Sequence, residues 1–296
     1  MKSIARLLAA ASLAVIAHPV LAEGAPEPEV TVTPVKGPLY MLQGRGGTML
    51  ASVGEDGVLL VDADYAELAP AHADALRELS GAEHAPRFLL NTHWHGDHTG
   101  GNALFAKRGS IIVAHENIRK RLSTRQEMKA LNRVVEPSPQ VALPVVTYGD
   151  SLALHFNGDD IEVQHFPRGH TDGDSVIFFA RENVVHIGDL IFVDRFPFVD
   201  IDSGGNVFGY IDNVDAVLQR VDDATVIVSG HAGLTDKVGL QRFHQMLKST
   251  SAQVKAALDK GMSVEQIVEQ GLGEQWQDWG TGFINEAALI SFIAGS

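Results

Sequence analysis

The chain has 296 residues, of which 45% are hydrophobic and 20% charged, so it can bury a large core and is not a disordered polymer. Its 37 acidic residues outnumber its 23 lysines and arginines, and the net charge of −14 argues against nucleic-acid binding, which needs a basic face. The absence of cysteine excludes disulfides and thiolate metal ligands, so a metal site in this chain would use imidazole and carboxylate groups.

The first 22 residues have the pattern of a cleavable secretory signal. Lys2 and Arg6 precede a short apolar stretch at residues 7–16, and Val-Leu-Ala at 20–22 gives a small-residue cleavage site. A membrane anchor is the weaker interpretation, because the apolar stretch is too short to span a bilayer and Pro19 follows it. We therefore expect a periplasmic or secreted protein without stable membrane insertion.

Residues 23–296 are predicted to form a single domain in which strands and helices alternate. After a leader that begins at residue 23, short apolar runs bounded by turn residues predict strands at about 30–34, 39–42, 47–53, 58–62, 88–91, 111–114, 152–156, 161–166, 175–179, 184–187 and 226–229. Apolar residues at helical spacing predict helices at about 66–79, 100–105, 236–258 and 264–270, with a helical tail over 276–296.

Residues 116–147 differ from the rest of the chain. The part from Ile118 to Val134 is basic and has a helical pattern, and the three prolines at 137, 139 and 144 interrupt regular structure after it. Two interpretations stay open, an inserted helical flap and an ordinary surface helix. We predict a helical insertion at about 116–147.

The segment His93-Trp94-His95-Gly96-Asp97-His98 places four metal-binding side chains in six positions, directly after an apolar strand. Histidine and aspartate are costly to bury without a cation, so this density indicates a metal site. His93 and His95 are two residues apart, and on an extended segment they point to the same side and can bind one ion. Asp97 and His98 come after the turn at Gly96 and can face a second ion.

Three further residues of ligand type each follow a predicted strand and lie beside glycine. They occur in the motifs Gly169-His170-Thr171, Gly188-Asp189 and Gly230-His231. Loops at strand ends commonly display catalytic groups, and glycine allows the backbone to turn sharply there.

Taken in this order, the hexad and the three glycine motifs resemble the metallo-β-lactamase superfamily, from about residue 36 to 248. The resemblance implies an α/β fold, an αββα four-layer sandwich of two mixed β-sheets flanked by helices, with metals at one sheet edge. It also implies that Asp189 bridges two metal ions. The remaining implied ligands are His93, His95 and His170 for one ion, and Asp97, His98 and His231 for the other.

The same resemblance implies an exported dinuclear zinc hydrolase, in which a metal-bound hydroxide opens a carbonyl bond of a small molecule. Asp97 would orient the water or take its proton. Several β-lactamases of the superfamily carry cysteine where Asp189 stands, so the ligand set is more similar to that of glyoxalase II and the lactonases.

Four functions therefore stay open. They are hydrolysis of a β-lactam, hydrolysis of a lactone or thioester, oxidation of a sulfur compound at a single iron, and metal-stabilised binding without turnover. Iron or manganese would also suit the imidazole and carboxylate ligands.

Some residues outside the motifs have two interpretations. Asp62 and Asp64 end a strand near the expected metal edge, and Asp172 and Asp174 follow His170, so each pair either supports a ligand or shapes a turn. The stretch 192–205, with several aromatic residues and Arg195, either forms a pocket wall or packs as an ordinary loop. Six histidines are expected to be structural, with a smaller chance of supporting ligands for His165 and His186: His72, His115, His155, His165, His186 and His244. Trp276 and Trp279 are expected to anchor the core.

Overall fold

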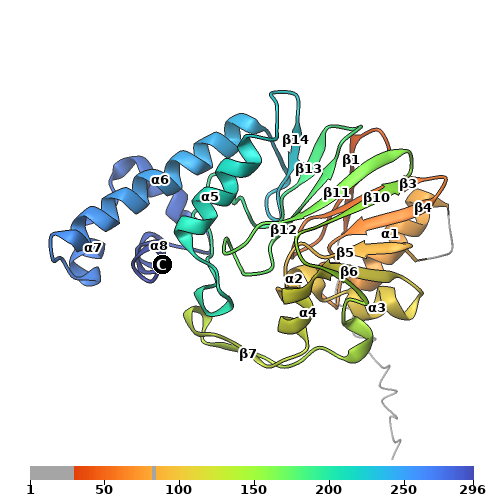
Figure 1. Ribbon diagram of the computed structural model, residues 1–296, viewed down its shortest axis with the longest axis horizontal. Coiled ribbons are helices and arrows are strands. Elements are labelled where there is room, and N and C mark those ends of the chain that lie inside the picture. Colours follow the sequence, from red (N-terminus) through yellow and green to blue (C-terminus); the bar gives the residue numbers. More distant parts are fainter. Residues whose placement is uncertain (1–29, 82–84) are drawn as a thin grey trace, which may run out of the picture.

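Two mixed β-sheets pack face to face in the computed structural model, which describes residues 30–81 and 85–296 (Figure 1). The predicted signal over 1–22 lies outside the described residues. Within them, the first sheet has seven strands in the order β1 (Thr31–Lys36), β2 (Leu39–Gln43), β3 (Met49–Gly54), β4 (Gly57–Val61), β5 (Phe88–Leu90), β6 (Ile111–His115) and β9 (Val146–Tyr148). The second sheet of the described chain has six, β10 (Ser151–Phe156), β11 (Asp159–His165), β12 (Ser175–Phe179), β13 (Val184–His186), β14 (Val226–Val228) and β15 (Leu234–Thr235).

Strand direction explains where the site forms. In the first sheet β4, β5 and β6 run parallel, so their carboxyl ends lie at one edge. In the second sheet β11 and β13 are both antiparallel to β12, and β14 is parallel to β13, so these three strands also end together. The loops after β4, β5, β11, β13 and β14 therefore meet at one edge of the sandwich.

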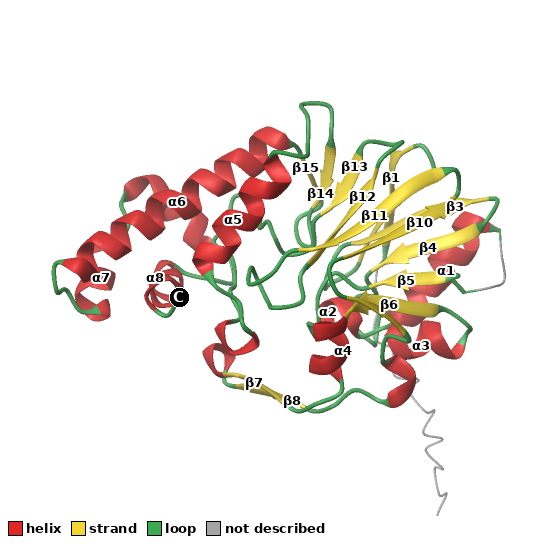
Figure 2. Cartoon of the chain, in the orientation of Figure 1, coloured by secondary structure: helices red, strands yellow, loops and turns green. Residues whose placement is uncertain are grey.

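Helices cover both outer faces, as Figure 2 shows. The helices are α1 (Ala69–Ser80), α2 (Gly96–Thr99), α3 (Asn102–Lys107), α4 (Glu116–Leu122), α5 (Val207–Leu218), α6 (Lys237–Asp259), α7 (Val264–Gln270) and α8 (Glu286–Ala294). Side chains of α1 and α3 pack with Leu60 on the outer face of the first sheet, whereas α5, α6 and α8 pack with Val185 of the second. Leu59 and Ile177 belong to the core between the sheets. The expected αββα sandwich is confirmed.

Local sequence explains several helix boundaries. Proline lies in the first turn of α1, and Gly81 ends that helix in the left-handed conformation that glycine adopts without strain. Asp236 caps α6 by accepting a hydrogen bond from the Gly239 amide. At α7, Ser263 and Gln266 form a capping box. None of the described helices has both the length and the apolar character that crossing a bilayer requires.

The predicted helical insertion over 116–147 is wrong for most of its length. The helix α4 ends at Leu122, and the chain continues into a β-hairpin of β7 (Gln126–Met128) and β8 (Arg133–Val135). The hydroxyl of Thr124 donates to the Lys120 carbonyl at 2.9 Å, and the side-chain amide of Gln126 donates to the Thr124 hydroxyl at 2.7 Å. These local bonds compete with further helix, and β-branched valines favour the second strand of the hairpin.

Other elements also differ from expectation, among them the strands β9 and β15, which the pattern did not predict. The sequence pattern did not identify α5, although Asn206 caps it and Tyr210, Val214 and Val217 form a buried helical stripe. The helical tail is divided into a 3-10 helix, Glu274–Thr281, and α8. Trp279 of the tail is buried in the core, as predicted, and Trp276 packs against it.

Candidate metal centre

All seven predicted ligand residues meet at the shared sheet edge. The hexad follows β5 and supplies four of them, while His170, Asp189 and His231 come from the loops after β11, β13 and β14. Their ligand atoms form three groups in which every atom lies within 4.8 Å of the others: His93, His95 and His170; His93, His98 and Asp189; and Asp97, His98 and His231. The convergence that the sequence pattern predicts is therefore present.

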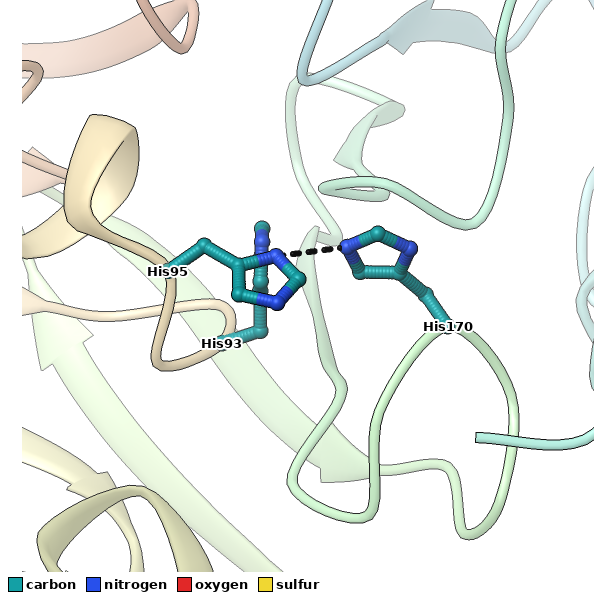
Figure 3. Close-up of side chains that lie close together, drawn as sticks. All are labelled: His93, His95 and His170. Atoms are coloured by element: carbon teal, nitrogen blue, oxygen red, sulfur yellow. Dashed lines mark hydrogen bonds between the residues drawn. The ribbon is translucent and has the colours of Figure 1, made fainter. Parts of the chain in front are cut away.

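The first group consists of three buried imidazoles (Figure 3). The Nδ1 atom of His95 and the Nε2 atom of His170 are 2.9 Å apart, and the ring centroids of His93 and His170 are 4.7 Å apart. Asp189 connects this group to the other two, because its Oδ2 lies 3.6 Å from His170 Nε2 and 3.2 Å from His231 Nε2. A carboxylate in this position can be shared by two cations.

In three of the candidate ligand histidines, the ring nitrogen that does not face the ligand groups is hydrogen-bonded to another residue. Asp200 contacts Nε2 of His95 at 3.0 Å, and Asp62 contacts Nδ1 of His98 at 2.7 Å. The carbonyl oxygen of Phe198 accepts from Nδ1 of His170 at 2.7 Å. Such contacts fix the tautomer and the ring orientation, and leave the other nitrogen free to bind a metal.

Unsatisfied buried atoms show that the residues fit a metal. Among the described residues, Nε2 of His93, Nε2 of His98 and Oδ1 of Asp189 are buried polar atoms without a hydrogen-bond partner. Buried polar atoms are normally paired, and these three point into the same ligand groups. Cations would satisfy all three, so the donor set fits a two-metal site of imidazole and carboxylate.

A close approach at Gly230 allows Asp189 to reach this position. A Cβ atom on Gly230 would overlap the Asp189 carboxylate, and one on Gly188, where φ is +54°, would lie 2.9 Å from Cβ of Thr92. Tyr210 of α5 donates a hydrogen bond to the Asp189 carbonyl from the helix side. The glycines of these two motifs thus have a steric reason to be there.

Without bound metal, four of the candidate ligand histidines have shifted pKa values, two lowered and two raised. Burial lowers the pKa of His93 well below its ordinary value and lowers the pKa of His170 to about 4. Burial also disfavours the charged forms of His98 and His231, but the surrounding carboxylates together outweigh it: Asp189, Asp62 and Asp97 for His98, and Asp189 and Asp97 for His231. The pKa of His98 is therefore raised well above its ordinary value and that of His231 to about 10.

Metal uptake by stripped protein should therefore depend on pH differently at the two sites. At pH 7 His93 and His170 carry no extra proton, whereas His98 and His231 must lose protons before they bind a cation. We expect affinity at the Asp97, His98 and His231 group to rise about tenfold per pH unit for each proton displaced. Zinc titrations followed by calorimetry at pH 6, 7 and 8 measure this, and equal pH slopes for both binding events would contradict it.

A pocket of about 270 Å³ opens over the ligand groups. His95, Asp97, His170, Asp189 and His231 line its floor. Its walls are largely apolar and come from the hairpin, the loop after β13 and the C-terminal segment: Met128, Leu131, Val135, Phe192, Phe196, Phe198, Phe283 and Ile284. The aromatic stretch after Asp189 therefore forms a pocket wall, which was one of its two interpretations.

The carboxylates near the motifs have different roles. Asp62 supports His98, whereas Asp64 pairs with His72, 2.8 Å away. Asp174 shapes the turn after His170 by accepting hydrogen bonds from the backbone and hydroxyl of Thr171, and burial raises its pKa to about 8. Asp172 forms an ion pair with Arg121.

The two histidines that could have supported ligands are structural instead. His186 contacts the Thr48 carbonyl, 3.0 Å away, and His165 contacts the Asp174 carbonyl at 2.9 Å, so each hydrogen-bonds to backbone. His165 also stacks on His115, with ring centroids 3.7 Å apart. Asp200, which holds His95, was not identified from the sequence, since no spacing or motif connects the two.

Comparison with known proteins decides the family. The model of the family described as "Metallo-beta-lactamase superfamily" matches residues 45–248, more than half of the chain. The chain belongs to the metallo-β-lactamase superfamily. It is a hydrolase of the metallo-β-lactamase fold with His/Asp groups suited to metal binding.

The proteins to which this chain is similar carry names of different activities. It is 24% identical over 247 residues to the 2,4-dinitroanisole O-demethylase subunit alpha of Nocardioides sp. (strain JS1661), an alignment that covers 82% of this chain and 70% of that protein. It is 27% identical over 142 residues to hydroxyacylglutathione hydrolase of Erythrobacter litoralis, covering 46% of this chain and about half, 48%, of the relative. A solved metallo-β-lactamase from Pontibacter korlensis superposes with a TM-score of 0.61 at 17% identity, covering 74% of this chain and 99% of that one.

Proposed function

We propose that the protein is an exported dinuclear zinc hydrolase that opens a carbonyl bond of a small molecule, with β-lactams as the first candidate substrates. The observation that carries the proposal is the set of three connected ligand groups, joined by Asp189, at the floor of an apolar pocket. The N-terminal signal pattern supports export, and an exported enzyme meets such antibiotics.

The chain's own residues provide the positioning. Two bound metal ions would lower the pKa of a shared water and polarise the substrate carbonyl. Asp97 lines the pocket, and its side chain is 20% exposed. Burial would raise the Asp97 pKa, but His98 and His231 outweigh it, so the pKa lies below the ordinary value and the carboxylate stays ionised. Asp97 can therefore accept a hydrogen bond from water and orient it.

The apolar walls complete the site by excluding bulk water from the reacting groups. Phe192 stacks on His231, with ring centroids 5.6 Å apart, and Phe198 lies 5.8 Å from the ring of His95. These contacts hold ligand imidazoles in place while presenting an aromatic surface to the substrate.

A second candidate is hydrolysis of a lactone or a thioester. Asp189 favours it, because a shared carboxylate in place of cysteine resembles the ligand set of glyoxalase II. The relatives' names cover a demethylase, a hydroxyacylglutathione hydrolase and a β-lactamase, so the shared fold alone does not select the substrate.

One preparation can test these alternatives together. Purified protein is analysed for metal and assayed with nitrocefin, dihydrocoumarin and S-lactoylglutathione, with His93→Ala as the inactive control. We expect about two zinc ions per chain by the proposed ligand set and turnover of at least one substrate that His93→Ala loses. One iron without zinc, together with failure of all three substrates, would contradict the proposal and favour the sulfur-oxidising alternative.

A further inference from the structure

Two arginines, Arg133 and Arg195, line the same pocket as the ligand groups. Arg133 lies on β8 of the hairpin, and Arg195 lies in the loop after β13. A Cβ atom on Gly96 would lie 4.0 Å from Nη2 of Arg133, so this guanidinium is next to the hexad. A Cβ atom on Gly282 would lie 3.1 Å from Cδ of Arg195, so the aliphatic part of the Arg195 side chain packs on the C-terminal segment.

Neither arginine is neutralised by a carboxylate. Among the described residues no ion pair involves Arg133 or Arg195, although the chain carries 37 acidic residues. Basic residues nearby do have partners, since Arg121 pairs with Asp172 at 2.7 Å and Lys129 with Asp202 at 2.8 Å. Both side chains are exposed, so their charges are available to a bound ligand.

The carboxylates that line the pocket belong to the candidate metal-binding groups. The two carboxylates are those of Asp97 and Asp189. With cations bound, the pocket would carry a surplus of positive charge that its own residues do not balance. A ligand with a negative charge would balance it, and the apolar walls would bind the ligand's uncharged body.

We propose that the pocket selects anionic small molecules with an apolar or aromatic body, and that Arg133 and Arg195 are specificity-determining residues that bind the anionic group. The inference deepens the proposed function, on which it rests for turnover, but the binding preference is measurable without turnover. The two arginines come from the hairpin and from the loop after β13, so two separate segments would contact the ligand.

Binding is tested with the metal-loaded protein and a matched pair of probes, naphthalene-2-sulfonate and the neutral methyl 2-naphthyl sulfone. Calorimetry should show the sulfonate binding about tenfold more tightly, because partly exposed ion pairs contribute modestly. Arg133→Met and Arg195→Met should each reduce this preference about threefold, and the double variant should remove it. Arg108→Met, which replaces an exposed arginine outside the pocket, should leave it unchanged.

Two results would overturn the inference: equal affinity for sulfonate and sulfone, or a sulfonate preference that persists in the double variant, as direct binding to the metals would give. Where the enzyme cleaves 4-nitrophenyl esters, the glutarate monoester and the pentanoate provide a kinetic test. The variants should raise KM for the charged ester about threefold or more with little change in kcat. If no substrate is cleaved but the sulfonate preference depends on the arginines, the proposed function fails while the binding inference stands.

Discussion

Replacing Asp189 by asparagine should remove one metal ion and nearly all turnover. The carboxylate oxygens of Asp189 approach His98, His170 and His231 at 3.2–3.6 Å, so this one side chain connects ligands of both proposed ions. Asparagine has one acceptor oxygen and one donor nitrogen, and a donor cannot bind a cation. Losing several kcal/mol of charge stabilisation corresponds to a decrease in kcat/KM on the order of 10³-fold.

The measurement combines metal analysis with turnover of the best panel substrate. Asp160→Asn is the matched control, because Asp160 is 80% exposed and its imidazole partner, His155, lies outside the site. The control should retain full metal content and activity. An Asp189→Asn protein with unchanged metal content and rate would show that this carboxylate is not a shared ligand.

Replacing Asp62 by asparagine should weaken the Asp97, His98 and His231 site selectively. Asp62 is fully buried and accepts hydrogen bonds from the backbone and hydroxyl of Thr92 as well as contacting Nδ1 of His98. An asparagine amide facing Nδ1 would donate to it and move the ring proton to Nε2, the atom that faces the metal site. Metal affinity there should fall about 10- to 100-fold, as for other supporting residues of metal ligands.

The matched variant is Asp200→Asn, since Asp200 supports His95 of the other site in the same way. Competition with a chromophoric chelator resolves the two binding events. We expect Asp62→Asn to weaken one event and Asp200→Asn the other. If both variants weakened the same event, or neither did, the assignment of ligands to two separate sites would be wrong.

The sequence predicted which candidate ligand side chains meet at the sheet edge, because they follow strands and stand beside glycine in a fixed order. Short-range signals of this kind are readable from one chain. Asp200 was not predicted, because it lies 105 residues from His95 and no local pattern connects them. Arg133 was not predicted either, since the basic segment around it has a helical pattern, and only tertiary contacts such as Lys129 with Asp202 bring the hairpin to the pocket.

Most strands were similarly readable, although β7, β8, β9 and β15 were not predicted. The helix α5 was missed because its apolar stripe is short and lies next to the long loop after Asp189. Asp62 occupies the left-handed region with φ of +62°, and the sequence could not provide the direction in which its side chain points. Hydrogen bonds that hold a ligand histidine, such as that of Asp62 to His98, depend on the direction of the side chain more than on the residue type.

The pocket walls come from segments that belong to neither of the large sheets. The hairpin is inserted between α4 and β9, and the segment around Phe283 comes almost fifty residues after the last strand. The hairpin and the C-terminal segment therefore shape the pocket without supplying any candidate ligand, whereas the loop after β13 supplies both Asp189 and part of the wall. Exchange of the hairpin between homologous enzymes should transfer selectivity while the catalytic platform beneath it stays intact, which makes this loop the natural place to diversify when engineering new substrates.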